Sequence, residues 1–459
     1  MFSLSTKEWI ITAISCLAFF MDGLDGSIAM IALPTITAYY GVGIDLSTWV
    51  LIGYLLIICA FILPMGKIVE RHGVKYIFIL GFAIFAGTSL ICAYAPTIWI
   101  LIAARLTQGL GACMLAAAAP ALLALKLPSS ICGYAFGMIG AASAIAFAFG
   151  PVIGGILVEY LSWQWIFLIN VPIGVIAVAI SLLYIDPDKN EAPKTRLDYE
   201  GAFLIAGTAS LLLILVNGWS VYPLWISVVL IGASCAMGYG ALKWEKGRED
   251  PIIPLALIYD TKMQKVLISL CLGVGVCTGF LFVLPFYMEV MRGISPAIAG
   301  LYLFLPAFLA AVISPFAGKE MDRRGGRIVT SIGALATVLT SAFFLIEGMI
   351  DVFFLFILSL LLFGTAMGLF QGPASGRIIS VAKKEWYALA SAFVSMCIYF
   401  GASIGTALFS GILSFYYTAN SGTNTDFFLG WTAICIIALI MSIIAWYYEW
   451  VVPDTGNEA

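Results

Sequence analysis

The sequence predicts an all-α membrane protein in which fourteen transmembrane helices form two related six-helix bundles and a two-helix insert. Of its 459 residues, 62% are hydrophobic and only 10% are charged, which is more apolar surface than a water-soluble domain can bury. The chain divides into fourteen apolar stretches of about 20 residues, the length that crosses a bilayer as a helix. A short charged turn occurs twice, once in each half of the chain.

Short breaks rich in Gly, Pro and charge separate the apolar stretches, and the longest of these breaks cover residues 186–200 and 243–260. The stretches are centred, in chain order, near Asp22, Ile57, Ile84, Thr107, Ser143, Ile173, Ser210, Val229, Gly279, Phe308, Val338, Leu360, Gly401 and Leu439. If the N-terminus is cytoplasmic and the helices alternate in direction, all Lys and Arg residues except Arg105 and Arg292 fall in cytoplasmic positions. This asymmetry follows the positive-inside rule, so both termini are expected in the cytoplasm.

The duplicated turn reads Gly-Lys-Ile-Val-Glu-Arg-His-Gly-Val-Lys at 66–75 and Gly-Lys-Glu-Met-Asp-Arg-Arg-Gly-Gly-Arg at 318–327. Gly, Lys, an acid, Arg, Gly and a base recur at the same offsets, and each copy joins the second and third helix of a six-helix set. An acid next to an arginine can latch one helix end to another and release it, although a solvated turn has the same composition. The residues assigned to this gating latch are Gly66, Glu70, Arg71, Gly73 and Lys75 in the first copy and Gly318, Asp322, Arg323, Gly325 and Arg327 in the second.

The repeat also predicts the domain boundaries. Residues 1–185 are expected to form an N-terminal six-helix bundle and residues 263–459 a C-terminal one. Residues 186–262 are expected to hold cytoplasmic linkers and the two-helix insert, at about 201–242, as a peripheral hairpin outside the transport path. Two homologous bundles place a substrate site at their interface, near the midplane of the bilayer.

Asp22 and Asp25 are the acids that lie deepest in an apolar stretch, because the first stretch covers residues 10–34. A carboxylate at that depth costs several kcal/mol in lipid, so it normally faces a cavity or a partner and marks an ion or substrate path. The i, i+3 spacing places both acids on one helical face, about 4.5 Å apart along the helix axis. Gly23 and Gly26 next to them leave room for backbone or ligand.

Arg105 is expected to lie opposite these acids, since it is the only base inside any of the predicted helices. Counting residues from the outer ends of the fourth and first stretches places Arg105 about 10 Å deep and Asp25 about 13 Å deep. An arginine favours the ionised carboxylate, whereas removal from water favours the protonated form, and a proton carrier needs the two in balance. A static salt bridge between the first and the fourth helix is the alternative.

Two more motifs place polar or small residues inside apolar stretches. The fourth stretch continues from Arg105 with Gln108 and Gly109, and the fifth stretch holds Gly150, Pro151, Gly154 and Gly155. Gly150 and Gly154 form a small-xxx-small face that lets helices pack closely, and Pro151 frees a backbone carbonyl and permits a kink. Generic helix packing would explain the second motif on its own.

Together these motifs resemble those of the major facilitator superfamily, and specifically of its fourteen-helix drug/proton antiporter branch, over essentially the whole chain. The duplicated turn is similar to the family's Gly-x-x-x-Asp-Arg-x-Gly-Arg-Lys loop, with Glu70 in place of the Asp and Val74 in place of a base. The motif in the fourth stretch resembles Arg-x-x-Gln-Gly, and the motif in the fifth stretch resembles that of the family's exporters and antiporters.

The first stretch is similar to the branch's first-helix signature, Leu-Asp-x-Thr-x-x-Asn-x-Ala-x-Pro, with Asp25 at the position of its Asp and Met30 at the position of its Asn. Asp22 is additional. The sixth stretch, at residues 163–174, also matches the branch, with a Gln in place of a usual Arg. The resemblance implies that Asp22 and Asp25 carry protons and that Arg105 sets their affinity, in a multi-pass protein of the plasma (inner) membrane.

The second bundle offers few ionisable groups, and Glu289 and Glu347 at helix ends are expected to be solvated rims. A cavity of Met and aromatic side chains suits promiscuous binding, although each such residue can equally face lipid or a neighbouring helix. The candidate residues of the substrate cavity are Met30, Phe282, Phe286, Gln371, Met396 and Tyr399.

The sequence therefore predicts a proton-coupled secondary exporter, or antiporter, of amphipathic or hydrophobic organic compounds that works by alternating access. Its expected partners are a small organic substrate, protons and the lipid bilayer, and it is expected to act as a monomer. Export of one dedicated lipid, siderophore or metabolite is the alternative reading. A channel or a sensor is less expected, because channels seldom need two homologous bundles with gate latches.

Other functional classes lack their residues. No stretch is basic enough for nucleic-acid binding. A membrane enzyme needs clustered nucleophiles, metal ligands or a base, yet the single His of the chain, His72, lies in a turn, so no catalytic residue, metal or cofactor is expected. The ten Cys residues lie in or next to apolar stretches without a CxxC motif, and are expected to be reduced packing residues.

Overall fold

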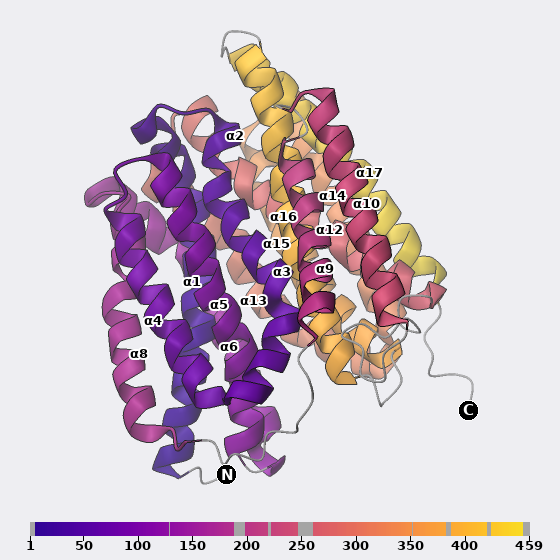
Figure 1. Ribbon diagram of the computed structural model, residues 1–459. Coiled ribbons are helices and arrows are strands. Elements are labelled where there is room, and N and C mark those ends of the chain that lie inside the picture. The colour runs from indigo at the N-terminus through magenta and orange to yellow at the C-terminus, as the bar shows by residue number, and fades with distance from the viewer. Residues whose placement is uncertain are drawn as a thin grey trace.

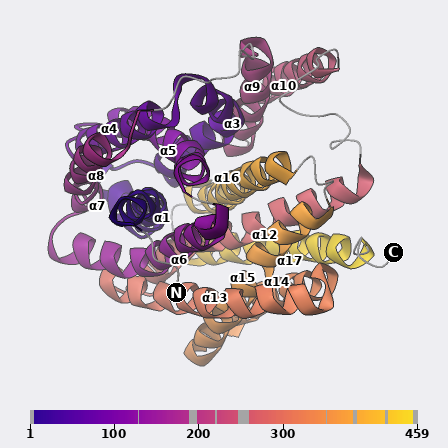
Figure 2. The same cartoon turned by 90° about the horizontal axis from the view of Figure 1, so that it is seen from below.

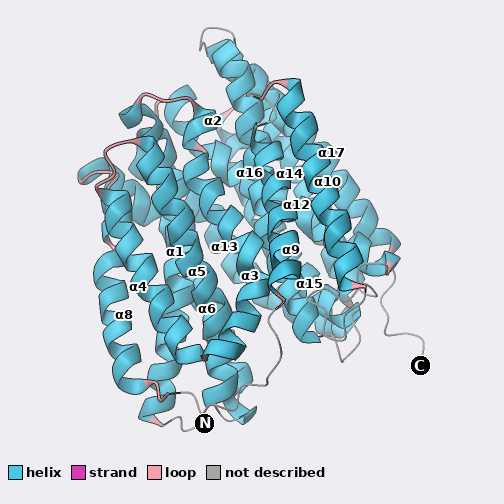
Figure 3. Ribbon diagram, viewed as in Figure 1, coloured by secondary structure: helices cyan, strands magenta, loops and turns pink. Residues whose placement is uncertain are grey.

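The computed structural model describes residues 5–127, 129–187, 198–218, 222–246, 260–350, 352–381, 387–419 and 424–452. Apart from short turns and loops, these ranges are helical and contain no strand (Figure 1, Figure 3). Among the described residues, thirteen helices are long and apolar enough to cross a membrane, and a further helix holds a shorter apolar stretch, Glu200–Val216. The predicted all-α membrane architecture is confirmed.

In chain order the helices are α1 (Thr6–Tyr40), α2 (Ile44–Ser47), α3 (Trp49–His72), α4 (Val74–Ala93), α5 (Ile98–Lys126), α6 (Ser129–Tyr160), α7 (Trp165–Leu168), α8 (Asn170–Tyr184), α9 (Tyr199–Gly218), α10 (Leu224–Glu245), α12 (Thr261–Phe286), the π-helical turn η1 (Tyr287–Met291), α13 (Pro296–Arg324), α14 (Gly326–Ile350), α15 (Phe353–Val381), α16 (Tyr387–Ala419) and α17 (Asn424–Val451). Helix α1 starts and α17 ends on the same face of the molecule, which we call the terminal face; the opposite face is the distal face (Figure 1).

Helix α1 has well-defined ends because its sequence supplies both caps. Ser5 accepts a hydrogen bond from the Glu8 amide and donates its own amide to the Glu8 carboxylate, which forms a capping box. Gly41 ends the helix with φ of 61°, a left-handed conformation that glycine adopts without strain. The 35 residues between these caps span about 52 Å, so α1 crosses the full hydrocarbon core and places its acids inside it.

Two groups of helices pack separately and meet along two seams. In the N-terminal bundle α1 packs on α6 and α5 packs on α3 and α4, and in the C-terminal bundle α12 packs on α16 and α14 on α15 and α17. The bundles meet where α6 packs against α13 and where α3 packs against α16, with α1 also touching α12 and α13 (Figure 2). Helix α1 is therefore an interface helix.

The insert helices α9 and α10 pack against each other at the side of the molecule (Figure 2). Helix α9 also packs on both α3 and α16 and so covers the seam between the bundles. Leu213 of α9 is fully buried there, next to Leu56 and Cys59 of α3.

The apolar cores differ between the two faces. In the distal half one cluster contains residues of both bundles, among them Ile31 and Leu33 of α1 and Phe280 and Phe282 of α12. In the terminal half each bundle has its own cluster, one built around α1, α4 and α5 and the other around α12, α15 and α16. The bundles thus share one core at the distal face, whereas at the terminal face each has its own core, and of the described residues only Leu55 of α3 and Tyr399 of α16 pack against the core of the other bundle.

Candidate functional site

The carboxylate of Asp25, on α1, is only 2% exposed and is held by side chains from two other helices. Arg105 on α5 donates to Oδ2 and forms a salt bridge with it. Gln108 on α5 and Asn170 on α8 donate to Oδ1 at 3.2 and 3.0 Å. Both carboxylate oxygens therefore have partners, one of them charged, which is the condition for burying an ionised group.

Arg105 is fully buried and is oriented by more than the acid. Its Nε donates to the Val50 carbonyl at 2.8 Å, and its Nη1 also donates to Gln108 Oε1 at 2.7 Å. Its guanidinium carbon lies 4.4 Å from the centre of the Tyr54 ring, a cation–π arrangement. The proximity of Arg105 and Asp25, predicted from their depths, is confirmed.

Asp22, almost one helical turn earlier on α1, has different partners. Tyr54 of α3 donates its hydroxyl to Oδ1, and Tyr399 of α16 donates its hydroxyl to Oδ2 at 3.2 Å. Helix α3 belongs to the N-terminal bundle and α16 to the C-terminal bundle. The predicted acid pair is therefore divided between two environments, with Asp25 inside one bundle and Asp22 at the interface of the two.

The glycines beside these acids have different surroundings. A Cβ atom added to Gly23 would lie 3.1 Å from the Ser143 carbonyl of α6, so this position allows close helix packing. A Cβ atom added to Gly26 would meet nothing within 4 Å. Because Gly26 follows Asp22 by four residues, it lies on the same helical face, and that face of α1 has open space next to the acid.

The motif of small residues on α6 joins three helices. A Cβ atom on Gly150 would collide with Ser27 of α1, and one on Gly155 would collide with the Pro296 carbonyl of α13. In return, a Cβ atom on Gly300 of α13 would collide with the Pro151 carbonyl. Gly154 similarly packs against Ile28 and Ile31 of α1. The motif therefore lies where α1, α6 and α13 meet, and part of it forms the contact between the bundles.

The duplicated turn has the same backbone conformation in both copies. Gly73 has φ of 91° and Gly325 has φ of 89°. At these angles the backbone of a residue with a side chain is strained, whereas glycine adopts them readily and so permits the sharp turn between the two consecutive helices. The base that follows each glycine points to the last helix of its own bundle. Lys75 donates to the Leu182 carbonyl at 3.3 Å, and the Arg327 guanidinium lies 4.9 Å from the Trp450 ring.

Other parts of the predicted latch are less constrained. A Cβ atom on Gly66 or on Gly318 would meet nothing within 4 Å. Arg71 is exposed, and Arg323 is paired with Glu320 at 3.7 Å on the surface of α13. The side chains of Glu70 and Asp322, the two acids of the latch, lie outside the described residues.

The six candidate cavity residues divide into two groups. Met30, Phe282 and Phe286 are buried in the distal cluster shared by the bundles. Met396 and Tyr399 are half-buried and pack along the seam of α3, α9 and α16, whereas Gln371 is half-buried on α15. Gly109, predicted with Gln108 as part of one motif, packs against the Tyr54 carbonyl and allows α5 to approach α3 closely.

Two buried charge networks of the C-terminal bundle were not predicted. At its distal end Glu347 is fully buried, and it accepts hydrogen bonds from Tyr287 at 2.9 and 3.1 Å and from Arg292 at 2.5 Å. The expectation of a solvated rim is wrong for Glu347, because η1 and the residue just after it bring a phenol and a guanidinium to it. Glu289 is half-buried.

At the terminal end of the same bundle Arg377 of α15 forms a salt bridge with Glu449 of α17, and both side chains are fully buried. Thr330 of α14 donates to the same carboxylate at 2.6 Å. The expectation that Arg105 is the only base inside a helix is therefore wrong. Arg377 lies near a helix end in the sequence, which is why it reads as a cytoplasmic base, and only the packing of three helices shows its burial.

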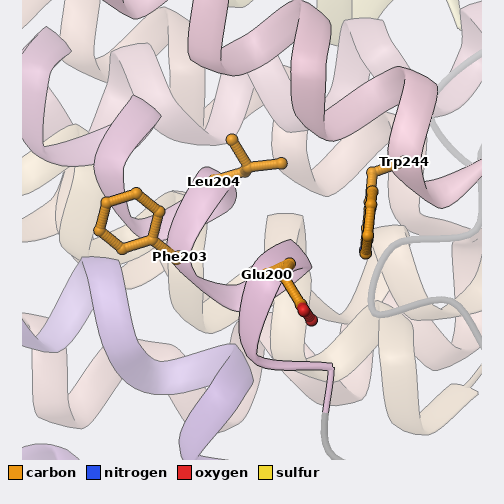
Figure 4. A pocket seen from close by; sticks show the side chains of 4 residues that line it. All are labelled: Glu200, Phe203, Leu204 and Trp244. Atoms are coloured by element: carbon orange, nitrogen blue, oxygen red, sulfur yellow. The ribbon is translucent and has the colours of Figure 1, made fainter.

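The insert carries a shallow groove of about 420 Å³ between α9 and α10, near the terminal face. It is lined by Glu200, Phe203, Leu204 and Trp244, whose side chains surround an open surface (Figure 4). None of these residues takes part in the acid networks described above.

Two bundles of membrane-spanning helices that join at one face, and that hold buried acids at and beside their interface, define a membrane transport protein. Residues 15–406 match the sequence model of the Major Facilitator Superfamily, and the chain belongs to that superfamily. It is a multi-pass membrane transporter rather than a membrane-embedded enzyme.

The chain is similar over most of its length to several known proteins. It is 28% identical over 449 residues to the riboflavin transporter RibZ of Clostridioides difficile (strain 630), covering 95% of this chain and 97% of that protein. It is 27% identical over 406 residues to the multidrug resistance protein Stp of Mycobacterium tuberculosis (strain ATCC 25618 / H37Rv), covering 88% and 75%. A solved bacterial homolog of the human lysosomal transporter Spinster, in an inward-facing and occupied conformation, aligns with a TM-score of 0.73 at 12% identity, covering 98% and 97%.

Proposed function

We propose that this transporter is a proton-coupled antiporter that exports amphipathic or hydrophobic organic compounds from the cell by alternating access. The protein would act as a monomer in the plasma membrane, with the terminal face in the cytoplasm. Residues 1–185 and 263–459 would be the two moving bundles, and residues 186–262 would hold the insert.

The observation that carries this proposal is the placement of Asp25 and Asp22. An antiporter needs a site that holds a proton in one state and releases it in another. Asp25 is buried and forms a salt bridge with the Arg105 guanidinium. Asp22 sits where the two bundles meet, so a movement of the bundles changes its surroundings.

Two further features favour access of water and substrate to this region. Arg105 Nη2 and Asn170 Oδ1 are buried and have no hydrogen-bond partner among the described residues. Buried polar atoms of this kind usually bind water or a ligand. The open space beside Gly26 lies on the same face of α1 as Asp22. A proton and a substrate would therefore meet near α1.

The packing of the two faces supports alternating access. The shared distal cluster closes one face, and the separate terminal cores leave the other free to part. The small-residue motif of α6 lies at the contact with α13 that would have to open in the opposite state. The duplicated turn would act as a latch at the terminal face, with Lys75 and Arg327 fixing each turn to its own bundle.

The substrate class is inferred from the cavity chemistry and from relatives. Met396 and Tyr399 give the seam an adaptable, largely apolar surface. The buried acids Glu347 and Glu449 already have basic partners, so they offer no free charge to select a cation. One similar protein is named a multidrug resistance protein, which fits export of varied organic compounds.

A second candidate is transport of one dedicated metabolite. It is favoured by the similarity to a riboflavin transporter, which covers 95% of this chain. An aromatic, amphipathic vitamin would suit the same apolar cavity, so the residues named above do not distinguish the two candidates.

The test is transport in reconstituted vesicles under an imposed pH gradient, with a lipophilic cationic dye, a neutral amphiphile and riboflavin as substrates. The wild type should accumulate at least one of them against its gradient, and the Asp22→Asn and Asp25→Asn variants should not. Accumulation of riboflavin alone would favour the second candidate. Full gradient-driven transport by both variants would remove these acids from the mechanism.

A further inference from the structure

The Asp22 carboxylate accepts a phenol hydrogen bond from each bundle. Tyr54 donates to Oδ1 and Tyr399 donates to Oδ2 at 3.2 Å. The two donors are chemically identical but belong to different bundles. Tyr54 belongs to the same bundle as Asp22 and moves with it, whereas Tyr399 belongs to the other bundle. Only the bond from Tyr399 depends on how the bundles are arranged.

The seam around Tyr399 is largely apolar, and α9 packs over it. Cys59 of α3 contacts the Met396 carbonyl of α16 at 3.9 Å, and Leu213 of α9 is fully buried against the same cluster. Helix α9 therefore covers the place where α3 and α16 meet. A hydrogen bond to an ionised group is stronger in such surroundings than in water.

The ionisable groups around Asp22 come from four helices. They are Asp25 on α1, Tyr54 on α3, Arg105 and Cys113 on α5, and Tyr399 on α16, with two of these five, Asp25 and Arg105, paired to each other. Helix α6 presents the uncharged Ser143 next to Gly23. The direct hydrogen-bond donors to the Asp22 carboxylate are therefore two phenol hydroxyls, and one of them comes from the opposite bundle.

We propose that Tyr399 is a positioning residue that links the arrangement of the two bundles to the protonation of Asp22, and thereby keeps the empty carrier from returning without cargo. This inference rests on the proposed proton-coupled function. A hydrogen bond to an ionised carboxylate is about twice as strong as one between neutral groups. The hydrogen bond from Tyr399 to ionised Asp22 thus stabilises the present arrangement of the bundles, and protonation of Asp22 weakens that bond. By thermodynamic linkage, the bond from Tyr399 in turn favours the ionised form of Asp22.

This device has a functional consequence for coupling. A carrier that crossed the membrane protonated in one direction and empty and ionised in the other would move protons without moving substrate. The Tyr399–Asp22 bond opposes the second crossing, because the empty, ionised form is the one that it stabilises. Substrate that enters beside Asp22 would replace the Tyr399 hydroxyl and release the bundles.

The first test needs no known substrate. Purified protein in vesicles is given an imposed pH gradient, and the decay of the gradient is followed with a pH-sensitive dye. The Tyr399→Phe variant should dissipate the gradient about tenfold faster than the wild type, the change in equilibrium that loss of one hydrogen bond to a charged group brings. The matched control, Tyr54→Phe, removes the same hydroxyl from the same carboxylate within one bundle and should raise the leak much less.

The double variant Tyr399→Phe/Asp22→Asn separates this mechanism from a damaged protein. It should bring the leak back to the wild-type rate, because it lacks the proton site on which Tyr399 acts. A leak that persists in the double variant, or equal leaks in the two single tyrosine variants, would overturn the inference. If Tyr399 only lined the substrate cavity, Tyr399→Phe would change the KM for substrate and leave the leak unchanged, which would also overturn it.

A second measurement distinguishes failure of this inference from failure of the proposed function. Spin labels at the exposed residues Tyr76 and Lys262, near the terminal face of the two bundles, report their separation as pH is changed. The wild type should respond to pH, and both Asp22→Asn and Tyr399→Phe should lose most of that response. Loss in Asp22→Asn alone would refute the role of Tyr399 and keep Asp22 as a proton site. No response in the wild type would refute both.

Discussion

Both bundles bury ion pairs, but in different relations to the interface. Arg105 and Asp25 of the N-terminal bundle lie next to α1, the helix that touches the other bundle, and Tyr54 connects them to Asp22. In the C-terminal bundle Arg377 and Glu449 join α15 to α17, and these helices pack mainly on their own bundle. Burial of charge in a membrane helix therefore does not by itself indicate a proton-coupling site. A buried charge indicates such a site when it is also connected to the interface between the two bundles.

The two bundles also differ in whether the charged side chains at their terminal face are exposed or buried. At the terminal face of the N-terminal bundle Lys75 and Lys126 donate to carbonyls at the end of α8, and Lys7 pairs with Asp186 on the surface. At the corresponding place in the C-terminal bundle the pair is fully buried. The comparison predicts a structural role for the second pair.

The largest expected effect is that of Asp25→Asn. It leaves the Arg105 guanidinium buried opposite a neutral amide, and the loss of one partner of a buried ion pair costs about 3–5 kcal/mol of stability. Uphill transport driven by a pH gradient should fall to background, whereas exchange of labelled for unlabelled substrate by the folded fraction should persist. Uphill transport at the wild-type rate would place Asp25 with the structural pairs.

Glu449→Gln should cost stability without uncoupling transport. It breaks a fully buried pair in the same way, so a loss of about 3 kcal/mol is expected, measured as a lower thermal midpoint in detergent. Transport per folded molecule should stay coupled to the pH gradient.

The double variant Arg377→Met/Glu449→Leu sharpens the comparison, because replacing both charges by apolar groups is often neutral. It should recover most of the stability and retain transport. The matching variant Arg105→Met/Asp25→Leu should not transport against a gradient. Loss of coupling in the first double variant would show that both bundles contribute proton sites.

Gly155→Ala should have an intermediate effect. Its added methyl group collides with the Pro296 carbonyl of α13, and overpacking of this kind costs roughly 1–3 kcal/mol. The substitution destabilises the arrangement in which α6 and α13 are in contact, so the distal face should open more often. Faster labelling of a cysteine placed at the buried residue Leu303 would report this, and Gly26→Ala, where the added methyl group has free space, is the control.

Asp186→Asn should have the smallest effect. The Lys7 ammonium lowers the pKa of the exposed Asp186 carboxyl below its usual value of 3.8. A lowered pKa means that the pair adds stability above the usual pKa and loses it as pH falls through the folded-state pKa. At low ionic strength, the thermal midpoints of wild type and variant should coincide at a pH below the folded-state pKa of Asp186, and they should differ only slightly at neutral pH. Equal midpoints in high salt at neutral pH would confirm that the interaction is a screened surface pair.

The sequence predicts the parts of this structure that depend on local pattern. Apolar length defines the helices, the duplicated turn defines the repeat, and the depth of Arg105 and Asp25 predicts their contact. Hydrophobicity and charge have a direct physical link to membrane position, so these predictions require no knowledge of packing.

Contacts between helices that are far apart in the sequence cannot be predicted from local pattern. Tyr399 and Asp22 are 377 positions apart, and nothing in the local sequence of either residue indicates the other. Asn170 is visible as a lone amide in the sixth stretch, but its bond to Asp25 depends on how α8 packs on α1. Glu449 looks like an acid at the end of a last helix, and its burial depends on Arg377 and Thr330 from two other helices.

The most direct test of the account is proton release from the purified transporter in a weakly buffered solution when a transported compound is added. Substrate and proton compete for the region around Asp22 and Asp25, so the wild type should release protons on binding and the Asp22→Asn/Asp25→Asn variant should release none. Undiminished proton release by that double variant, with binding intact, would contradict the account.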